Sequence, residues 1–195
     1  MFLVFDTETN GLPGNVRYPA EYVLNWPNVV QLSWGIYDHD GNEVKFYDYI
    51  IKPKGFTITE ESSKIHGITN EIARREGHAI KDVLYQFKES LKKVNYIVAH
   101  NFHFDINALG AEYIRNNIKL SYKSIKKEIC TMKLTTKFCN IPSTYYKNEL
   151  KWPKLQELYK KIFKKSFENS HNSKYDVKAC ARCLFYCIKN DIIRI

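Results

Sequence analysis

Four carboxylates in the sequence have the residue types and spacing to hold divalent metal ions. Asp6 and Glu8 follow an apolar run and are two residues apart, so in an extended segment both side chains leave the same face. Two carboxylates on one face repel each other unless a cation lies between them, and Mg²⁺ prefers such oxygen ligands. Taken alone, the pair is more simply explained as a solvated strand end.

Two later acids change that interpretation. Asp105 comes shortly after a short apolar segment, residues 96–99, and Asp176 lies near the start of the last predicted helix. Sites in open α/β sheets gather outside the carboxyl ends of the strands. We therefore expect both acids to converge on Asp6 and Glu8.

His171 precedes Asp176 by five residues, in a polar stretch with residue types typical of a helix N-cap. An unperturbed imidazole titrates near ~6.5, so an exposed histidine there can accept a proton from water at neutral pH. The alternative is an inert loop histidine, which such a residue usually is.

Hydrophobic periodicity indicates which elements position these residues. Alternating or apolar runs predict strands over residues 2–6, 29–37 and 43–51, with Asp40-Gly41 as a hairpin turn between the last two. Residues 11–26 are turn-rich and predict a long loop. Helical spacing follows in residues 59–93, 104–116, 155–163 and 174–189, with strands at 96–99 and within 128–132. This order predicts an α/β fold: a five-stranded mixed sheet, its first three strands an antiparallel meander, flanked by helices.

The composition limits the class of protein. A length of 195 residues predicts a single domain over residues 1–195, and 44% hydrophobic with 26% charged residues is typical of soluble globular proteins. The net charge of +9 favours a polyanionic partner, without distinguishing DNA, RNA and membrane surface. The absence of a long apolar run and of a signal-peptide pattern predicts a soluble, intracellular protein that does not span a membrane.

The five cysteines are expected to be reduced thiols. Cys180, Cys183 and Cys187 share one face of the last predicted helix with Leu184, which favours packing in the core. A metal site is the alternative, but no second Cys/His pair completes a zinc set.

Four segments, in order along the chain, resemble the motifs of one enzyme family. They are FDTETNGL at residues 5–12, HGIT at 66–69, HNFHFD at 100–105 and HNSKYD at 171–176. Each is weak alone, but the series resembles the DEDDh (DnaQ-like) 3′-5′ exonuclease family, which includes proofreading subunits of bacterial DNA polymerases. The resemblance covers the chain almost end to end and implies a ribonuclease H-like fold. It also implies that the four acids and the histidine of the family are Asp6, Glu8, Asp105, Asp176 and His171.

The resemblance further implies hydrolysis with two Mg²⁺ ions about 4 Å apart, for which Mn²⁺ substitutes. Asp6 would bridge the ions, and Glu8 and Asp176 would complete the site of the ion that carries the attacking water. Asp105 would support the other ion, and His171 would accept the proton of the water. The products would be nucleoside 5′-monophosphates and a strand shortened at its 3′ end.

Substrate contacts are expected in the turn after the first two acids. In the family, residues that match Thr9 and Leu12 contact the terminal nucleotide, while Gly11 is interpreted as permitting a tight turn. Leu12 as a plain loop anchor is the alternative. His66 lies between residues typical of helix caps, so it has either a structural role or a nucleotide contact. His100 and Asn101, predicted to end a strand, either orient ligands or satisfy backbone groups.

Lysines and aromatic residues cluster in residues 122–127 and 145–165, including Lys147, Lys151, Trp152 and Lys154. They could track a single strand by phosphate contact and base stacking, or form a solvated helix face.

Three rivals to a DNA exonuclease stay open. They are an exoribonuclease with the same chemistry, a non-catalytic nucleic-acid-binding or polymerase-associated scaffold, and a ribonuclease H-like endonuclease. The expected partner is a single-stranded 3′ end, with DNA favoured over RNA. A separate polymerase would be required for proofreading, and the oligomeric state is open.

Overall fold

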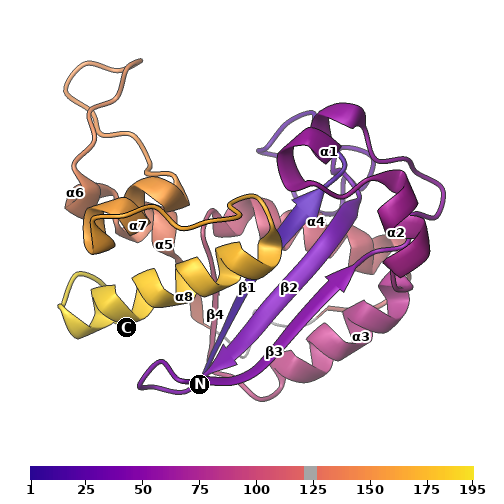
Figure 1. Ribbon diagram of the computed structural model, residues 1–195, viewed down its shortest axis with the longest axis horizontal. Coiled ribbons are helices and arrows are strands. Elements are labelled where there is room, and N and C mark those ends of the chain that lie inside the picture. The colour runs from indigo at the N-terminus through magenta and orange to yellow at the C-terminus, as the bar shows by residue number, and fades with distance from the viewer. Residues whose placement is uncertain (121–126) are drawn as a thin grey trace.

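A computed structural model describes residues 1–120 and 127–195 of the chain. The strands of these residues form one sheet in the order β3-β2-β1-β4-β5 (Figure 1). Their bounds are Phe2–Thr9 (β1), Val29–Tyr37 (β2), Glu43–Ile50 (β3), Tyr96–Ala99 (β4) and Lys127–Cys130 (β5). Strands β1, β2 and β3 pair in antiparallel fashion, whereas β4 runs parallel to both β1 and β5. The structure confirms the mixed sheet with an antiparallel meander.

Strand β1 is longer than the sequence predicted, and this difference matters for the acids. We expected the strand to end at Asp6, but pairing with β2 continues through Thr9. Asp6 lies opposite Ser33 and Glu8 lies opposite Gln31. Both acids are therefore fixed by the sheet ladder instead of following it in a loop.

Eight helices are described. Their bounds are Glu60–His66 (α1), Asn70–Glu76 (α2), Ile80–Leu91 (α3), Phe102–Arg115 (α4), Thr131–Leu134 (α5), Thr136–Cys139 (α6), Leu155–Phe163 (α7) and Ser173–Lys189 (α8). The predicted bounds of α7 are confirmed, and α4 begins two residues before its predicted start. The helical stretch from residue 59 is divided by caps: Gly67 ends α1 with a φ of 76°, and the Thr69 side chain accepts a hydrogen bond from Ile72 N at the start of α2.

Alternating residues of β1 face two separate hydrophobic cores. Leu3 and Phe5 pack in the core that includes residues of α3 and α4, whereas Phe2 and Val4 pack in the core formed with α7 and α8. Side chains of a strand alternate between faces, so Asp6 and Glu8 continue the face of Phe2 and Val4. The two acids therefore lie on the side of the sheet that α8 covers.

The cysteines of α8 are core residues, as predicted. Cys180, Cys183 and Cys187 are buried free thiols in the core beside α7. Burial raises the pKa of Cys187 to about 12, and it also raises the pKa of Cys180 and Cys183. These thiols are therefore protonated at neutral pH and are poor metal ligands.

The predicted loop over residues 11–26 has neither helix nor strand. Its last residue, Trp26, is buried, and its indole Nε1 donates hydrogen bonds to the carbonyl oxygens of Tyr18 and Pro19 at 3.1 and 3.2 Å. Arg115 of α4 donates to the carbonyl oxygens of Val23 and Trp26, both at 2.5 Å. The loop is thus tied to α4, the helix that carries Asp105.

Among the described residues, no helix is both long and apolar enough to cross a membrane. The basic and aromatic stretch predicted at residues 122–127 lies outside the described residues, apart from Lys127.

Candidate active site

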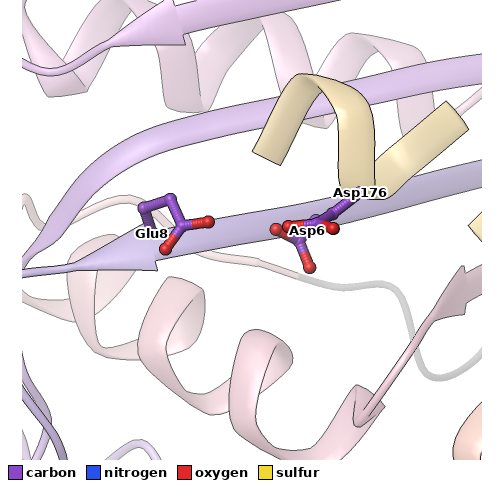
Figure 2. Close-up of side chains that lie close together, drawn as sticks. All are labelled: Asp6, Glu8 and Asp176. Carbon is purple, nitrogen blue, oxygen red and sulfur yellow. The ribbon is translucent and has the colours of Figure 1, made fainter. Parts of the chain in front are cut away.

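Three of the four predicted acids form one cluster. Asp6 and Glu8 project from β1, and Asp176 projects from the first turn of α8 toward Asp6 (Figure 2). One carboxylate oxygen of each residue lies within 4.8 Å of the others. The cluster thus joins residues 170 positions apart in the sequence and offers three oxygen ligands to a hard cation.

Asp105 approaches the same region from the opposite side of the sheet. Its Oδ1 accepts hydrogen bonds from the backbone N and the hydroxyl of Thr7, at 3.1 and 2.8 Å. This contact exists because β4 pairs with β1 only as far as Val4 and then gives way to α4, leaving the Thr7 amide free of the ladder. Asp105 is 3% exposed and lies close enough to raise the pKa of Asp6. It lies beside the cluster of three and does not contribute an oxygen to it.

A polar network fixes the start of α8, and with it Asp176. The Oε1 atom of Gln31 accepts a hydrogen bond from Ser173 N at 3.2 Å, and the hydroxyls of Ser33 and Ser173 lie 2.6 Å apart. Asp48 of β3 accepts hydrogen bonds from both Gln31 and Ser33 at 2.8 Å. The Asn172 side chain caps the helix by accepting from Lys174 N. Gln31, Ser33 and Asp48 were not predicted as site residues, because polar residues in a strand have no distinguishing sequence signal.

His171 lies next to the cluster, and its side chain is exposed. Its backbone N donates a hydrogen bond to Asp176 Oδ2 at 2.9 Å, and its φ of 66° places it in the left-handed region. The backbone of His171 therefore orients Asp176, while the imidazole stays accessible to solvent and to a ligand.

Burial raises the pKa of all four acids, and repulsion between carboxylates adds to the rise for Asp6, Glu8 and Asp105. Burial, followed by the nearby charges of Asp105, Asp176 and Glu8, raises the pKa of Asp6 well above its ordinary value. Burial, followed by the charges of Asp176 and Asp105, raises the pKa of Glu8 to about 8. Burial also raises the pKa of Asp105 and of Asp176 to about 7, although hydrogen bonds to their oxygens oppose the rise. A divalent cation would relieve both the repulsion and the loss of hydration.

The turn after β1 differs in part from its prediction. The Thr9 hydroxyl donates to the carbonyl oxygen of Gly11 at 2.7 Å, so it stabilises the turn itself. The φ of Gly11 is not positive and a Cβ there would meet nothing within 4 Å, so this turn does not depend on a glycine. Leu12 is 86% exposed and therefore does not anchor the loop.

His66 and Asn101 flank this region in different ways. His66 is 6% exposed and its Nδ1 accepts a hydrogen bond from Ile68 N at 3.1 Å, just after the end of α1. Burial lowers its pKa, and the backbone of Thr9 opposes this, so α1 lies against the turn. Its Nε2 is buried without a hydrogen-bond partner of normal geometry in the described part of the chain. Asn101 is the exposed N-cap of α4 with a φ of 75°, and not the end of β4.

His100 has a structural role. Its Nε2 lies 2.9 Å from the carbonyl oxygen of Pro153, which can only accept, so this nitrogen carries the proton. Its Nδ1 then accepts from the Thr131 hydroxyl at 2.9 Å. Burial lowers the pKa of His100 to about 4, so the imidazole is neutral. His100 thus satisfies a hydroxyl and a carbonyl group of the protein, one with each ring nitrogen.

Comparison with known proteins gives consistent results. The RNase_T family model, described as "Exonuclease", matches residues 3–184. The PolC-type DNA polymerase III of Streptococcus sanguinis is 29% identical over 189 residues, covering 97% of this chain and 11% of that protein. The PolC-type enzyme of Lactococcus lactis is 26% identical over 184 residues, 94% of this chain and 10% of that protein. The chain thus spans about a tenth of the length of these relatives.

Two solved structures are similar over nearly the whole chain. Exonuclease X in complex with 5′ overhanging duplex DNA has a TM-score of 0.67 at 21% identity, covering all of this chain and 95% of that one. The zinc-bound complex of Escherichia coli exonuclease I with single-stranded DNA has a TM-score of 0.75 at 20% identity, covering 97% of this chain and 40% of that one. At these identities the likeness establishes the shared fold.

Proposed function

The chain belongs to the RNase_T exonuclease family, and we propose that it removes nucleotides one at a time from the 3′ end of single-stranded DNA. The observation that carries the proposal is the convergence of Asp6, Glu8 and Asp176 within 4.8 Å, with Asp105 beside them. The products would be nucleoside 5′-monophosphates.

The acids fit a site for divalent metal ions. Carboxylate oxygens are the ligands that Mg²⁺ prefers, and burial together with the neighbouring carboxylates raises the pKa of Asp6 and Glu8. Asp6, Glu8 and Asp176 would hold the metal directly, while Asp105, already bonded to Thr7, would act from one side. Bound there, two Mg²⁺ or Mn²⁺ ions would stabilise the charge on the attacking and leaving oxygens of the scissile phosphate.

The residues of the chain itself would supply the remaining chemistry. The exposed imidazole of His171 would take the proton from the attacking water, while its backbone N keeps Asp176 in place. Leu12, exposed on the turn after β1, would pack against the terminal base. Thr9, whose hydroxyl is used within the turn, would contact the terminal sugar through its backbone, with Gly11 adjacent. His66 and Asn101 would border the same nucleotide.

DNA is proposed as the substrate because both kinds of relative are associated with it. The matched region of the PolC-type relatives belongs to DNA polymerases, and the two similar exonucleases were solved with DNA. The polymerase relatives also support a role in proofreading or repair, in which a polymerase would be a partner. The net charge of +9 is suited to a phosphate backbone.

The proposal is tested with 5′-labelled single-stranded DNA and RNA of matched sequence, incubated with the protein in Mg²⁺, in Mn²⁺ and in EDTA. We expect a ladder of 3′-shortened DNA in either metal, none in EDTA, and slower shortening of RNA. Faster shortening of RNA would identify an exoribonuclease. Cleavage of a circular strand would identify an endonuclease, and intact substrates in every condition would favour a binding scaffold.

A further inference from the structure

The segment between α6 and α7 projects away from the rest of the molecule (Figure 1). We call this segment, residues 141–153, the arm. It is a short hairpin: Ser143 N donates to the carbonyl oxygen of Glu149 at 2.8 Å, and Lys151 N donates to that of Ile141 at 3.0 Å. The Ser143 hydroxyl accepts from two amides at the tip, at 3.2 and 3.1 Å. The arm is thus an ordered projection, and the alternative of a solvated helix face is wrong for this stretch, because α7 begins only at Leu155.

The arm exposes aromatic rings that do not contribute to the core. Tyr145 is 90% exposed, Tyr146 is 65% exposed and Trp152 is 58% exposed. Large rings are usually buried, since each removes a large apolar area from water. Three exposed rings on one hairpin therefore indicate a surface that a ligand covers.

Positive charge accompanies these rings. The Lys133 ammonium of α5 lies 5.6 Å from the centroid of the Trp152 ring, and Lys147 lies in the tip between the strands of the hairpin. The acidic Glu157 beside the arm is neutralised by Lys151 at 2.5 Å. Aromatic rings with adjacent ammonium groups match the alternation of bases and phosphates in a single strand.

Hydrogen bonds connect the base of the arm, at Pro153, to residues near the acid cluster. His100, the residue after β4, donates to the carbonyl oxygen of Pro153 and accepts from Thr131. The Thr131 hydroxyl lies 3.6 Å from the thiol of Cys180, which is one helical turn after Asp176. A continuous set of contacts therefore connects the arm to α8 at the site.

We propose that the arm binds the single strand upstream of the nucleotide being removed, with Tyr145 and Trp152 stacking on bases and Lys133 and Lys147 contacting phosphates. This inference rests on the proposed exonuclease function, because it assigns the arm to the strand that enters that site. Short substrates do not reach the arm, so the arm raises activity only on longer strands.

Fluorescence gives a direct test of binding, since Trp26 and Trp34 are buried and Trp152 is the exposed tryptophan of the three. We expect an oligodeoxythymidylate of about 20 nucleotides, added in EDTA, to quench the fluorescence of Trp152 by stacking on its ring. Tyr145→Ala should weaken binding about tenfold. The extent of Trp152 quenching at saturating oligonucleotide should be unchanged in this variant. The double variant Tyr145→Ala/Trp152→Ala should weaken binding further, with binding measured by the anisotropy of a labelled strand.

Activity provides the second test. In Mg²⁺ the double variant should degrade the long strand at least tenfold less efficiently than wild type, yet cleave a dinucleotide at the wild-type rate. Tyr85→Ala on α3, which removes another exposed tyrosine, is the matched control and should change neither rate.

The outcomes separate this proposal from the proposed function. Wild-type binding and long-strand cleavage by the double variant would overturn the role of the arm and indicate a protein-contacting arm instead. Equal losses of cleavage rate on the dinucleotide and on the long strand would also overturn the role of the arm. If the wild type cleaves neither substrate, the exonuclease proposal fails, while quenching of Trp152 still reports whether the arm binds the strand.

Discussion

Glu8→Gln should stabilise the protein without metal while removing its activity. The substitution keeps the shape of the side chain and removes its charge from a cluster that includes Asp6 and Asp176. Burial, followed by the nearby charges of Asp176 and Asp105, raises the pKa of Glu8 from 4.5 to about 8. Because the folded protein holds this proton more tightly than the unfolded chain, stability falls as the pH rises from about 4.5 to about 8.

The size of the effect follows from that rise. At pH 8.5 the ionised Glu8 costs on the order of 4 kcal/mol, since one pKa unit corresponds to about 1.36 kcal/mol. Relaxation around the wild-type carboxylate reduces the gain, so we expect Glu8→Gln to be more stable by roughly 2 kcal/mol or more. For a chain of this size, that gain corresponds to a rise in Tm of roughly 4–8 °C. At pH 4.5 the two proteins should differ by less than about 1 kcal/mol.

Thermal and urea unfolding in EDTA, followed by circular dichroism at both pH values, measure this difference. Mg²⁺ should raise the Tm of the wild type at pH 8.5 more than that of Glu8→Gln, because the variant lacks one ligand. Glu21→Gln, which removes a charge from an exposed loop residue, is the control and should show neither effect. A variant that is less stable than wild type at pH 8.5 would refute the picture of repelling buried acids.

Three further substitutions test individual residues. Thr7→Val removes the hydroxyl that donates to Asp105 at 2.8 Å and should lower kcat about tenfold, whereas Thr7→Ser keeps the hydroxyl and should keep kcat. Equal losses of kcat in the two variants would exclude this hydrogen bond as the cause. Leu12→Ala should slow strand degradation while changing the free energy of unfolding by less than about 0.5 kcal/mol, because the side chain is 86% exposed; a larger loss of stability in urea unfolding would instead identify a loop anchor. Asparagine at position 171 tolerates the left-handed φ of 66° and preserves the backbone hydrogen bond to Asp176, so His171→Asn should leave the Tm unchanged. Loss of the imidazole should slow single-turnover cleavage by about 10²- to 10⁴-fold, and an unchanged rate would remove His171 from the mechanism.

Elements set by local patterns could be predicted from the sequence. The alternation in residues 29–37 and the helical spacing in residues 155–163 gave the bounds of β2 and α7, because each pattern matches the period of its element. The convergence of Asp6, Glu8 and Asp176 was also predicted, since the order of the motifs matched one family.

Contacts between distant segments could not be predicted. The hydrogen bonds from Thr7 to Asp105 depend on where β4 ends relative to β1, which no local pattern specifies. Gln31 and Ser33 hold the start of α8, yet in the sequence they are ordinary polar residues of a strand. The arm is likewise visible only in three dimensions, because its lysines and rings have the same composition as a solvated helix.

The acid cluster is tested most directly by measuring nucleoside 5′-monophosphates released from single-stranded DNA by wild type and by Asp176→Asn, with Mg²⁺ and with EDTA. The asparagine can still accept the hydrogen bond from His171 N, so the fold should be retained. We expect release by the wild type in Mg²⁺ alone and none by the variant. Full activity of a correctly folded Asp176→Asn protein, or release in EDTA, would contradict a metal-dependent site built on these acids.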